Sequence, residues 1–308
     1  MSKFDDSDLI INYHDAVIYG SDLKLFNRRS EWLNDSCIHF YFAFLQQQQK
    51  YQRQQQQQKE GELSFLFMDP SVVSFWIHQC TDQDDIKEFV NNIDFPGKDG
   101  TSSNSGGVIF VPVNDNMSNS SNSWQTPNSG SHWSLLLIVV GCDKNECNNN
   151  DKDDSDSEDD DKNDNDDDSE VTLRFWHFDS IRNSGNIRAA QDIAERMRLH
   201  VYPGKKNKEN SDTMKVIQAE TPQQLNGYDC GVHVLGAAKI FASTIPKMIN
   251  NYSGNNKFDN FFLDSLDDAL RKVIGKCPLN FCSKLRNEIS SEILRLRQEK
   301  LQLLSTSK

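Results

Sequence analysis

The chain has 308 residues, and 46 acidic against 33 basic side chains give it a formal net charge of −13. Fifteen acidic residues and three lysines between Asp143 and Glu170 carry −12 of that charge, which leaves −1 for the rest of the chain. This distribution excludes a dominant basic surface of the kind that binds nucleic acid, and no run of 18 apolar residues is present to span a membrane.

Low-complexity sequence interrupts the chain at residues 46–58 (Gln-rich), 97–106 and 117–131 (both Ser/Asn-rich) and 143–170 (acidic). These stretches hold too little apolar surface to offset the entropy of ordering them. Strongly apolar segments flank each one, so we expect insertions within a single domain that spans residues 1–308. Roughly 220–240 residues remain to build one core.

The first third of the chain favours helices. A strand is expected at Ala16–Tyr19, and Asn34 or Asp35 can cap a helix that the glutamine run extends into solvent. Pro70 opens a second helix, and Ile86–Ile93 reads as a third. The buried face of the second helix is predicted to hold Val72, Phe75, Trp76 and Cys80.

β-rich runs dominate the middle of the chain, at Gly107–Val113, Trp133–Val140 and Val171–Phe178. Ile187–His200 is predicted to be helical, and Met214–Ala219 is predicted to form a further strand.

Two helices are predicted near the C-terminus. Gly231–Ser243 is apolar nearly all round, which is typical of a helix buried by the rest of a fold. Ser283–Leu304 has one apolar face without a strict heptad repeat, which favours a packed helix over a coiled coil. Helices, then strands, then helices predict an α+β fold.

The seven cysteines are an odd number, and the polar N-terminus lacks the pattern of a signal peptide. We therefore expect free thiols in a reducing compartment, the cytosol or the nucleus. Neither Cys142 and Cys147 with His177 nor Cys277 with Cys282 has the spacing of a zinc site, and the acidic tract lacks the EF-hand pattern. The sequence predicts no metal and no cofactor.

Cys230 is the candidate nucleophile. It begins the apolar helix, and the positive potential at a helix N-terminus favours a thiolate. Gly231 is expected to leave room for a substrate backbone. The alternative is a buried cysteine with only a packing role.

The sequence also offers a catalytic base and a carboxylate to orient it, provided that the strands Trp133–Val140 and Val171–Phe178 pair as a hairpin. His132 at the entry of the first strand then lies beside Asp179 at the exit of the second, although 47 positions separate them. Acyl transfer also needs a donor for the developing oxyanion, and the spacing to Cys230 does not distinguish Gln223 from Gln224.

Four motifs, in this order, resemble the sentrin/SUMO-specific cysteine proteases: Trp32-Leu33-Asn34-Asp35, His132-Trp133-Ser134, Asp179-Ser180 and Gln224 through Gly231. The resemblance implies a papain-like fold with a mixed central sheet and the catalytic cysteine at the N-terminus of a buried helix. It assigns His132 as base, Asp179 as orienting group and Cys230 as nucleophile. The oxyanion glutamine of the family falls on Gln224. The residues implied to bind the substrate tail are Trp32, Asn34, Asp35 and Trp133.

The segment Phe110–Asn116 and the short region before Trp32 resemble the deneddylase branch of that family. This implies a monomeric enzyme that cleaves after the C-terminal Gly-Gly of a ubiquitin-like modifier, the neddylation modifier first. It would mature the precursor and release the modifier from lysine conjugates such as cullins, with no nucleic acid or membrane as partner. The alternatives are a SUMO-specific protease of the same family and a catalytically silent module that binds a modifier.

Overall fold

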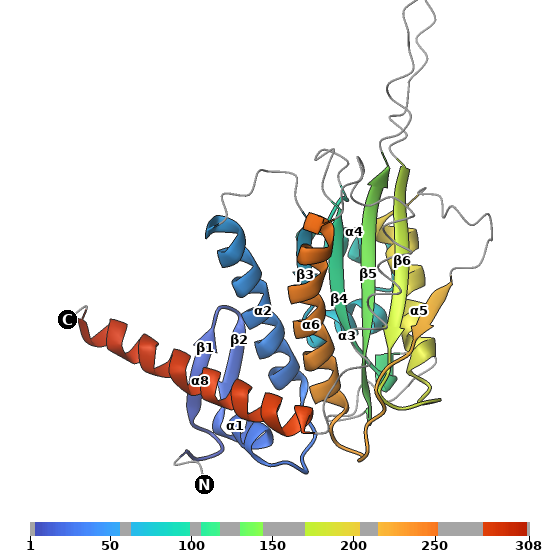
Figure 1. Ribbon diagram of the computed structural model, residues 1–308. Coiled ribbons are helices and arrows are strands. Elements are labelled where there is room, and N and C mark those ends of the chain that lie inside the picture. The colour runs from blue at the N-terminus through green and yellow to red at the C-terminus, as the bar shows by residue number, and fades with distance from the viewer. Residues whose placement is uncertain are drawn as a thin grey trace, which may run out of the picture.

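The computed structural model describes residues 4–55, 63–98, 106–117, 130–143, 170–203, 215–251 and 280–306. The low-complexity stretches at 97–106, 117–131 and 143–170 lie mostly outside these residues, as do residues 56–58. Their interpretation as insertions within one domain stays a prediction. The described residues form a central sheet with helices on both faces (Figure 1).

The central sheet has five strands, which follow the chain in spatial order: β3 (Ser64–Phe67), β4 (Gly107–Asn114), β5 (Trp133–Asp143), β6 (Glu170–Phe178) and β7 (Val216–Ala219). The two outer pairs are parallel, and the pairs β4–β5 and β5–β6 are antiparallel. The predicted mixed sheet of an α+β fold is therefore confirmed. The strands β4 and β5 are continuous apolar runs because both faces of the sheet are covered by helices.

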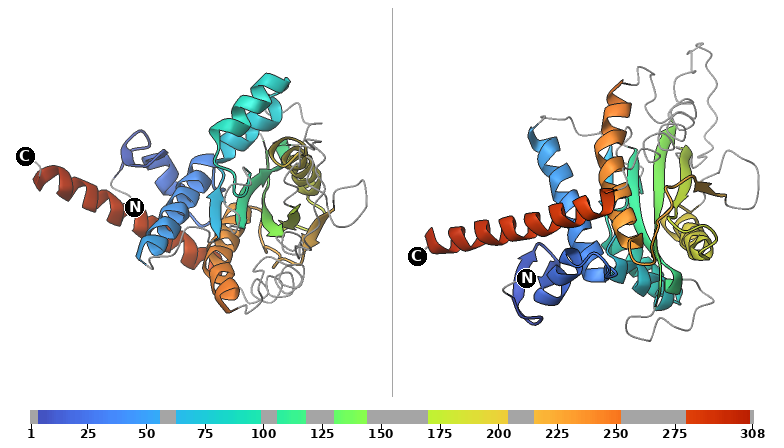
Figure 2. Two further views of the ribbon diagram at one scale, coloured as in Figure 1. Left: turned by 90° about the horizontal axis from the view of Figure 1, so that it is seen from above. Right: turned by 60° about the horizontal axis from the view of Figure 1, so that its bottom comes forward.

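Helices cover the two faces of the sheet unequally (Figure 2). One face carries α6 (Cys230–Asn251), which packs on β5 beside α2 (Asp35–Gln55). The opposite face carries α3 (Pro70–His78), α4 (Gln83–Asn92) and α5 (Asn186–Arg196), and α5 continues into a π-helical turn, η3 (Met197–Val201). The prediction that the helix beginning near residue 230 is buried by the rest of the fold is confirmed, because eight of its first eleven residues are buried and the other three are half-buried.

The two ends of the chain pack together beside this core. A hairpin of β1 (Leu9–Tyr13) and β2 (Ala16–Tyr19) leads into α1 (Gly20–Asn27), and α8 (Phe281–Thr306) crosses α1, β1 and α6 (Figure 1). Leu285, Ile289 and Ile293 are buried in this contact, which confirms the predicted apolar face of a packed helix.

The buried face of α3 differs from the prediction. Val73, Trp76 and Ile77 are buried, whereas Val72 is half-buried and Phe75 is 48% exposed. The Trp76 indole stacks on a ring of α4, Phe89, with the ring centroids 5.0 Å apart, and this contact fixes the rotation of α3. Trp76 and Cys80 are therefore buried as predicted, while the prediction for Val72 and Phe75 is wrong.

The glutamine run continues α2 as far as Gln55, as expected, but its first turn belongs to the packed structure. The side-chain amide of Gln46 donates to the carbonyl of Phe65 at 2.8 Å and accepts from the N–H of Phe67 at 3.0 Å. Gln49 is buried. The expectation that the whole run lies in solvent is wrong for these two residues, because Gln46 extends the hydrogen bonding of the edge strand β3.

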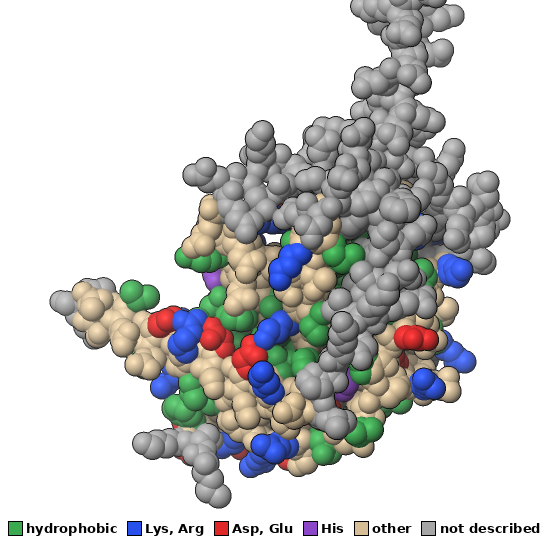
Figure 3. Space-filling model, viewed as in Figure 1, with side chains coloured by type: hydrophobic (Ala, Val, Ile, Leu, Met, Phe, Trp, Pro, Cys, Tyr) green, Lys and Arg blue, Asp and Glu red, His purple; other side chains and the backbone are tan. Residues whose placement is uncertain are grey.

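The outer surface of α8 mixes the two signs of charge. Arg295 pairs with Glu292 and Glu299 on that helix, and Lys239 of α6 pairs with Glu288. Figure 3 shows basic and acidic side chains interspersed on this face of the molecule. In the part of the chain described, no helix is both long and apolar enough to cross a membrane.

We predict that Gln46→Ala lowers the free energy of unfolding by about 1–3 kcal/mol, because the partners at Phe65 and Phe67 lose their hydrogen bonds. Gln48→Ala, two positions along the same helix at an exposed site, should change it by less than about 0.5 kcal/mol. Urea unfolding followed by circular dichroism measures both values. Equal effects from the two substitutions would contradict a role for Gln46 in the fold.

Candidate active site

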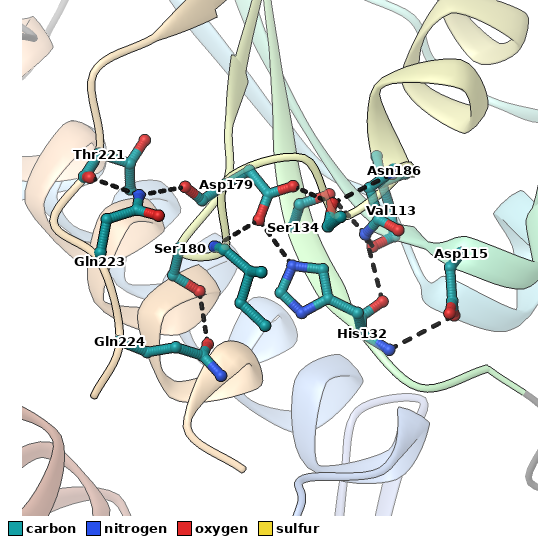
Figure 4. A network of polar contacts seen from close by, with 12 residues as sticks. Val113, Asp115, His132, Ser134, Asp179, Ser180, Asn186, Thr221, Gln223 and Gln224 are labelled. Atoms are coloured by element: carbon teal, nitrogen blue, oxygen red, sulfur yellow. Dashed lines mark hydrogen bonds and ion pairs between the residues drawn. The ribbon is translucent and has the colours of Figure 1, made fainter. Parts of the chain in front are cut away.

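His132 and Asp179 meet at one end of the β5–β6 ladder. Leu135 pairs with Phe178 in the antiparallel register, so the residue before β5 and the residue after β6 come together. The Nε2 atom of His132 lies 2.6 Å from Oδ1 of Asp179 (Figure 4). The hairpin predicted from the sequence is confirmed, and so is the juxtaposition that it implied.

Asp179 is buried and held by three donors. Oδ1 accepts from His132 and from the backbone N–H of Ile181 at 2.8 Å, and Oδ2 accepts from the hydroxyl of Ser184. Burial raises the pKa of the Asp179 carboxyl, but the hydrogen bonds from His132, Ser184 and Ile181 outweigh it and the net pKa is lowered. Asp179 is therefore a carboxylate at neutral pH.

The surroundings of His132 favour the positively charged form of its imidazole. Burial lowers the pKa of its imidazole, while Asp179 and the adjacent Cys230 side chain raise it, and the result is a pKa of about 9. Its Nδ1 atom is buried and makes no hydrogen bond among the described residues. Because Asp179 occupies Nε2, Nδ1 is the ring nitrogen that remains for the cysteine side.

Cys230 is the first residue of α6 and only 2% exposed. Asn226 shapes the turn before it: its Oδ1 accepts from the N–H groups of Tyr228 and Asp229 at 3.1 and 3.0 Å. The carbonyl of Asp229 then accepts the first helical hydrogen bond, from His233. The thiol thus lies where a helix presents N–H groups without intrahelical acceptors.

Gly231 has a different role from the one predicted. A Cβ atom at this position would lie 3.1 Å from Cβ of Leu33 and 3.3 Å from Cδ1 of Ile38. The absent side chain lets α6 approach the start of α2, so the expectation that Gly231 leaves room for a substrate backbone is wrong. Leu33 and Ile38 fill that space.

The two adjacent glutamines are used differently. Gln223 donates through Nε2 to the carbonyls of Asp179 and Thr221, which engages both N–H groups of its amide. Gln224 is oriented by the hydroxyl of Ser180, which donates to its Oε1 at 2.7 Å (Figure 4). The Nε2 of Gln224 donates to the carbonyl of Asn226. One N–H of the Gln224 amide is left over from these bonds, and it is the one suited to an oxyanion.

The predicted tail-binding residues fall into two groups. Trp32 is 48% exposed, and Asp35 is an exposed residue at the first position of α2. Trp133 is buried, and its indole N–H donates to the carbonyl of Leu33 at 3.0 Å, which draws the segment around Trp32 towards β5. Asn34 is the residue that caps α2, since its Oδ1 accepts from the N–H of Cys37.

A buried polar network behind His132 was not predicted. Asn186 donates through Nδ2 to the carbonyls of His132 and Val113 and to the hydroxyl of Ser134 (Figure 4). The Ser134 hydroxyl also bonds Nε2 of His177 at 2.8 Å. Burial lowers the pKa of His177 to about 4, so this histidine is neutral. Ser134 and His177 are polar residues inside apolar strands, a signal of buried hydrogen bonding. Asn186 gives no such signal.

Among the described residues, no three His, Cys, Asp or Glu side chains gather in the manner of a metal site. Of the residues considered for zinc, His177 is engaged in the network behind His132, and Cys147 and Cys277 lie outside the described residues. Cys37, Cys80 and Cys230 are free thiols.

Residues 31–273 match the model of the Ulp1 protease family, C-terminal catalytic domain. The chain belongs to the Ulp1 protease family. It is a cysteine protease, as the resemblance implied, and the matched segment includes every residue predicted for the site.

Related proteins match nearly the whole chain. NEDD8-specific protease 1 of Arabidopsis thaliana is 27% identical over 97% of this chain and 98% of its own length. The probable sentrin-specific protease 8 of Dictyostelium discoideum is 27% identical over 94% of this chain and 98% of its own length. A crystal structure described as that of the de-sumoylating protease superposes with a TM-score of 0.55 at 18% identity, covering 96% of this chain and 94% of that one. It shares the fold of this Ulp1-family protease.

We predict that His132 titrates in this Ulp1-family protease with a pKa of about 9, while His177 stays neutral down to about pH 4. Asp179→Asn should move the titration of His132 towards or below the ordinary value of about 6.5, because the substitution removes the carboxylate that favours the imidazolium. NMR titration of the histidine ring resonances measures both groups, and His177 is the internal control. A wild-type His132 that titrates near 6.5 would contradict the proposed charge state.

We further predict that the charge of the acidic tract does not reach His132. Strand β5 ends at Asp143, about 35 Å from His132 at 3.4 Å per residue, and the screening length at physiological salt is about 8 Å. Replacing Lys144–Ser169 by an Asn-Gly turn between Asp143 and Glu170, which pair in the ladder, should leave the pKa of His132 within about 0.1 of its wild-type value. The same titration tests this. A larger change would mean that the deleted segment approaches the site.

Proposed function

We propose that this protease is a deneddylase. It cleaves after the C-terminal Gly-Gly of NEDD8, matures the precursor and removes the modifier from lysine side chains of conjugates such as cullins. The observation that carries the proposal is the charged His132–Asp179 pair beside Cys230 at the N-terminus of α6. The names of the relatives that match over nearly the full chain support NEDD8 as the modifier.

In the proposed reaction, Cys230 reacts as a thiolate whose proton is held by His132. Its sulfur attacks the carbonyl carbon of the last glycine, and the carbonyl electrons move to oxygen. The backbone N–H of Cys230 and the free N–H of Gln224 stabilise that oxyanion. The tetrahedral intermediate collapses to a thioester as the C–N bond breaks, and His132 gives its proton to the leaving amine. Water, deprotonated by His132, then attacks the thioester; the C–S bond breaks, and the Cys230 thiolate and the His132 imidazolium are restored.

Asp179 has two tasks in this sequence. It holds the His132 ring so that Nδ1 serves the sulfur, and it stabilises the imidazolium that donates to the amine. The side chains of Ser184 and Gln223 hold Asp179 in turn, through its carboxylate and its backbone carbonyl. The pair therefore keeps one geometry through both half-reactions.

The substrate tail is proposed to run between Trp32 and Trp133, with Asp35 close to its path and Asn34 fixing the local backbone. Flat indole surfaces accept glycine and exclude residues with side chains, which suits a Gly-Gly terminus. Support comes from the exposed ring of Trp32 and from the bond between the Trp133 indole and the carbonyl of Leu33, which brings the two tryptophan-bearing segments together.

The proposal also covers the cellular compartment and the oligomeric state of the enzyme. The free thiols of Cys37, Cys80 and Cys230 fit a reducing compartment, so we propose that the enzyme acts in the cytoplasm, the nucleus or both. We also propose that it acts as a monomer. A SUMO-specific protease would use the same chemistry, because modifier choice depends on surface side chains away from the reacting atoms.

We predict that NEDD8 vinyl sulfone labels the wild-type protein and does not label Cys230→Ala. Cys80→Ala, at a buried free thiol on the opposite face of the sheet, is the matched control and should be labelled like the wild type. Gel shift and mass spectrometry identify the modified residue. Labelling by a SUMO probe alone would identify SUMO, and not NEDD8, as the modifier that this enzyme processes. Tight NEDD8 binding without labelling or turnover would identify a catalytically silent binding module.

A further inference from the structure

Arg286 of α8 is a charged residue in the interior of the protein. Its relative exposure is 1%, although its neighbours on the same helix face are the apolar residues Leu285 and Ile289. A buried arginine is unfavourable unless its donors are satisfied. The contacts of this side chain therefore indicate what holds it there.

The guanidinium of Arg286 donates to four residues on two segments. Nη1 donates to the carbonyl of Leu25 at 2.8 Å, and Nη2 donates to the carbonyl of Glu31 at 2.8 Å. On the other side, Nη2 bonds the carbonyl of Tyr228 at 3.2 Å, while Nε and Nη2 bond Oδ1 of Asp229 at 3.2 and 2.9 Å. A planar fork with five N–H groups can serve several acceptors at once, which a lysine cannot.

These two segments lead directly to the two sides of the site. The carbonyl of Glu31 belongs to the peptide that enters Trp32, and Tyr228 and Asp229 are the residues immediately before Cys230. Arg286 therefore connects the segment that carries the exposed Trp32 to the residues just before α6, through hydrogen bonds made in the protein interior. The close packing of Gly231 on Leu33 joins the same two segments from the other side.

We propose that Arg286 is a positioning residue that sets the distance between Trp32 and the Cys230 sulfur, and with it the depth at which the substrate tail meets the nucleophile. The proposal rests on the function proposed above. Arg286 lies beyond residues 31–273, the segment matched by the family model, so α8 adds to the catalytic domain an element on which the site geometry depends.

The expected consequence of removing this fork is a loss in kcat rather than in KM. We expect a folded modifier to bind this protein mainly through surface outside its C-terminal tail, so that KM depends little on the exact placement of the tail. The reaction rate depends on the placement of the last glycine, where an error of 1 Å can cost about 100-fold. Arg286→Met should thus lower kcat at least about tenfold and change KM less than about threefold.

Arg295→Met is the matched control. Arg295 is on the same helix and pairs with Glu292 and Glu299, but it is exposed and contacts neither segment. This substitution should leave kcat and KM within about twofold of wild type, since exposed ion pairs contribute little. Arg286→Lys keeps the charge and loses the fork, and it should resemble Arg286→Met in kcat.

A double variant separates positioning from stability. Arg286→Met leaves the buried Asp229 carboxylate without its partner and should lower Tm, whereas adding Asp229→Asn removes the unpaired charge and should recover much of the Tm. Because the bonds to Glu31 and Tyr228 are still missing, kcat should stay low in the double variant, and below that of Asp229→Asn alone.

The assay is hydrolysis of NEDD8 carrying a C-terminal fluorogenic amide, with Tm measured by differential scanning fluorimetry. Low kcat in Arg286→Met and in the double variant, beside normal kcat in Arg295→Met, supports the proposal. Wild-type kcat in Arg286→Met, or recovery of kcat together with Tm in the double variant, overturns it and leaves the proposed function standing. A wild-type protein that hydrolyses neither this substrate nor the SUMO equivalent overturns both.

Discussion

The antiparallel ladder between β5 and β6 is the constraint on which the site depends. It pairs residues from Leu135 opposite Phe178 to Asp143 opposite Glu170, and both strands are enclosed by helices. A slip of one residue would turn the side chains of one strand to the opposite face and would separate Ser134 from His177, which are hydrogen-bonded in this register. That register alone places His132 beside Asp179. The other parts of the site, α5 behind the histidine and α6 with its cysteine, pack on opposite faces of the same sheet (Figure 2).

Burial disfavours the charged form of every titratable group at this end of the sheet, and the hydrogen-bond partners decide which groups are nevertheless charged. His132 and Asp179 are both removed from water, but each is hydrogen-bonded to the other, and this pairing outweighs the cost of burying charge. His177 lies two residues before Asp179; among the described residues its hydrogen-bond partner is the neutral hydroxyl of Ser134, and it stays neutral. The positive charge is thereby confined to the one imidazole that faces the cysteine, and Asn186 fixes the backbone of that residue.

The sequence predicts the parts of the structure whose geometry follows from the periodicity of apolar residues. It does not predict those whose geometry depends on contacts between side chains far apart in the chain. Two strands of apolar residues sufficed to bring His132 and Asp179 together. The rotation of α3 was misjudged because almost every residue from Val72 to Ile77 is apolar, so only the stacking of Trp76 on α4 selects a face. Strand β1 was missed because its turn uses His14 in a left-handed conformation, φ 54°, where glycine or asparagine usually signals a hairpin.

The burial of α6 also affects which parts of the protein unfold locally. A helix enclosed on nearly every side exchanges its amide hydrogens with solvent only when a large part of the molecule unfolds, whereas the exposed end of α8 opens locally at little cost. The first N–H groups of any helix, however, have no intrahelical acceptor. The nucleophile therefore lies where a mostly buried helix begins with N–H groups that accept no protection from intrahelical hydrogen bonds.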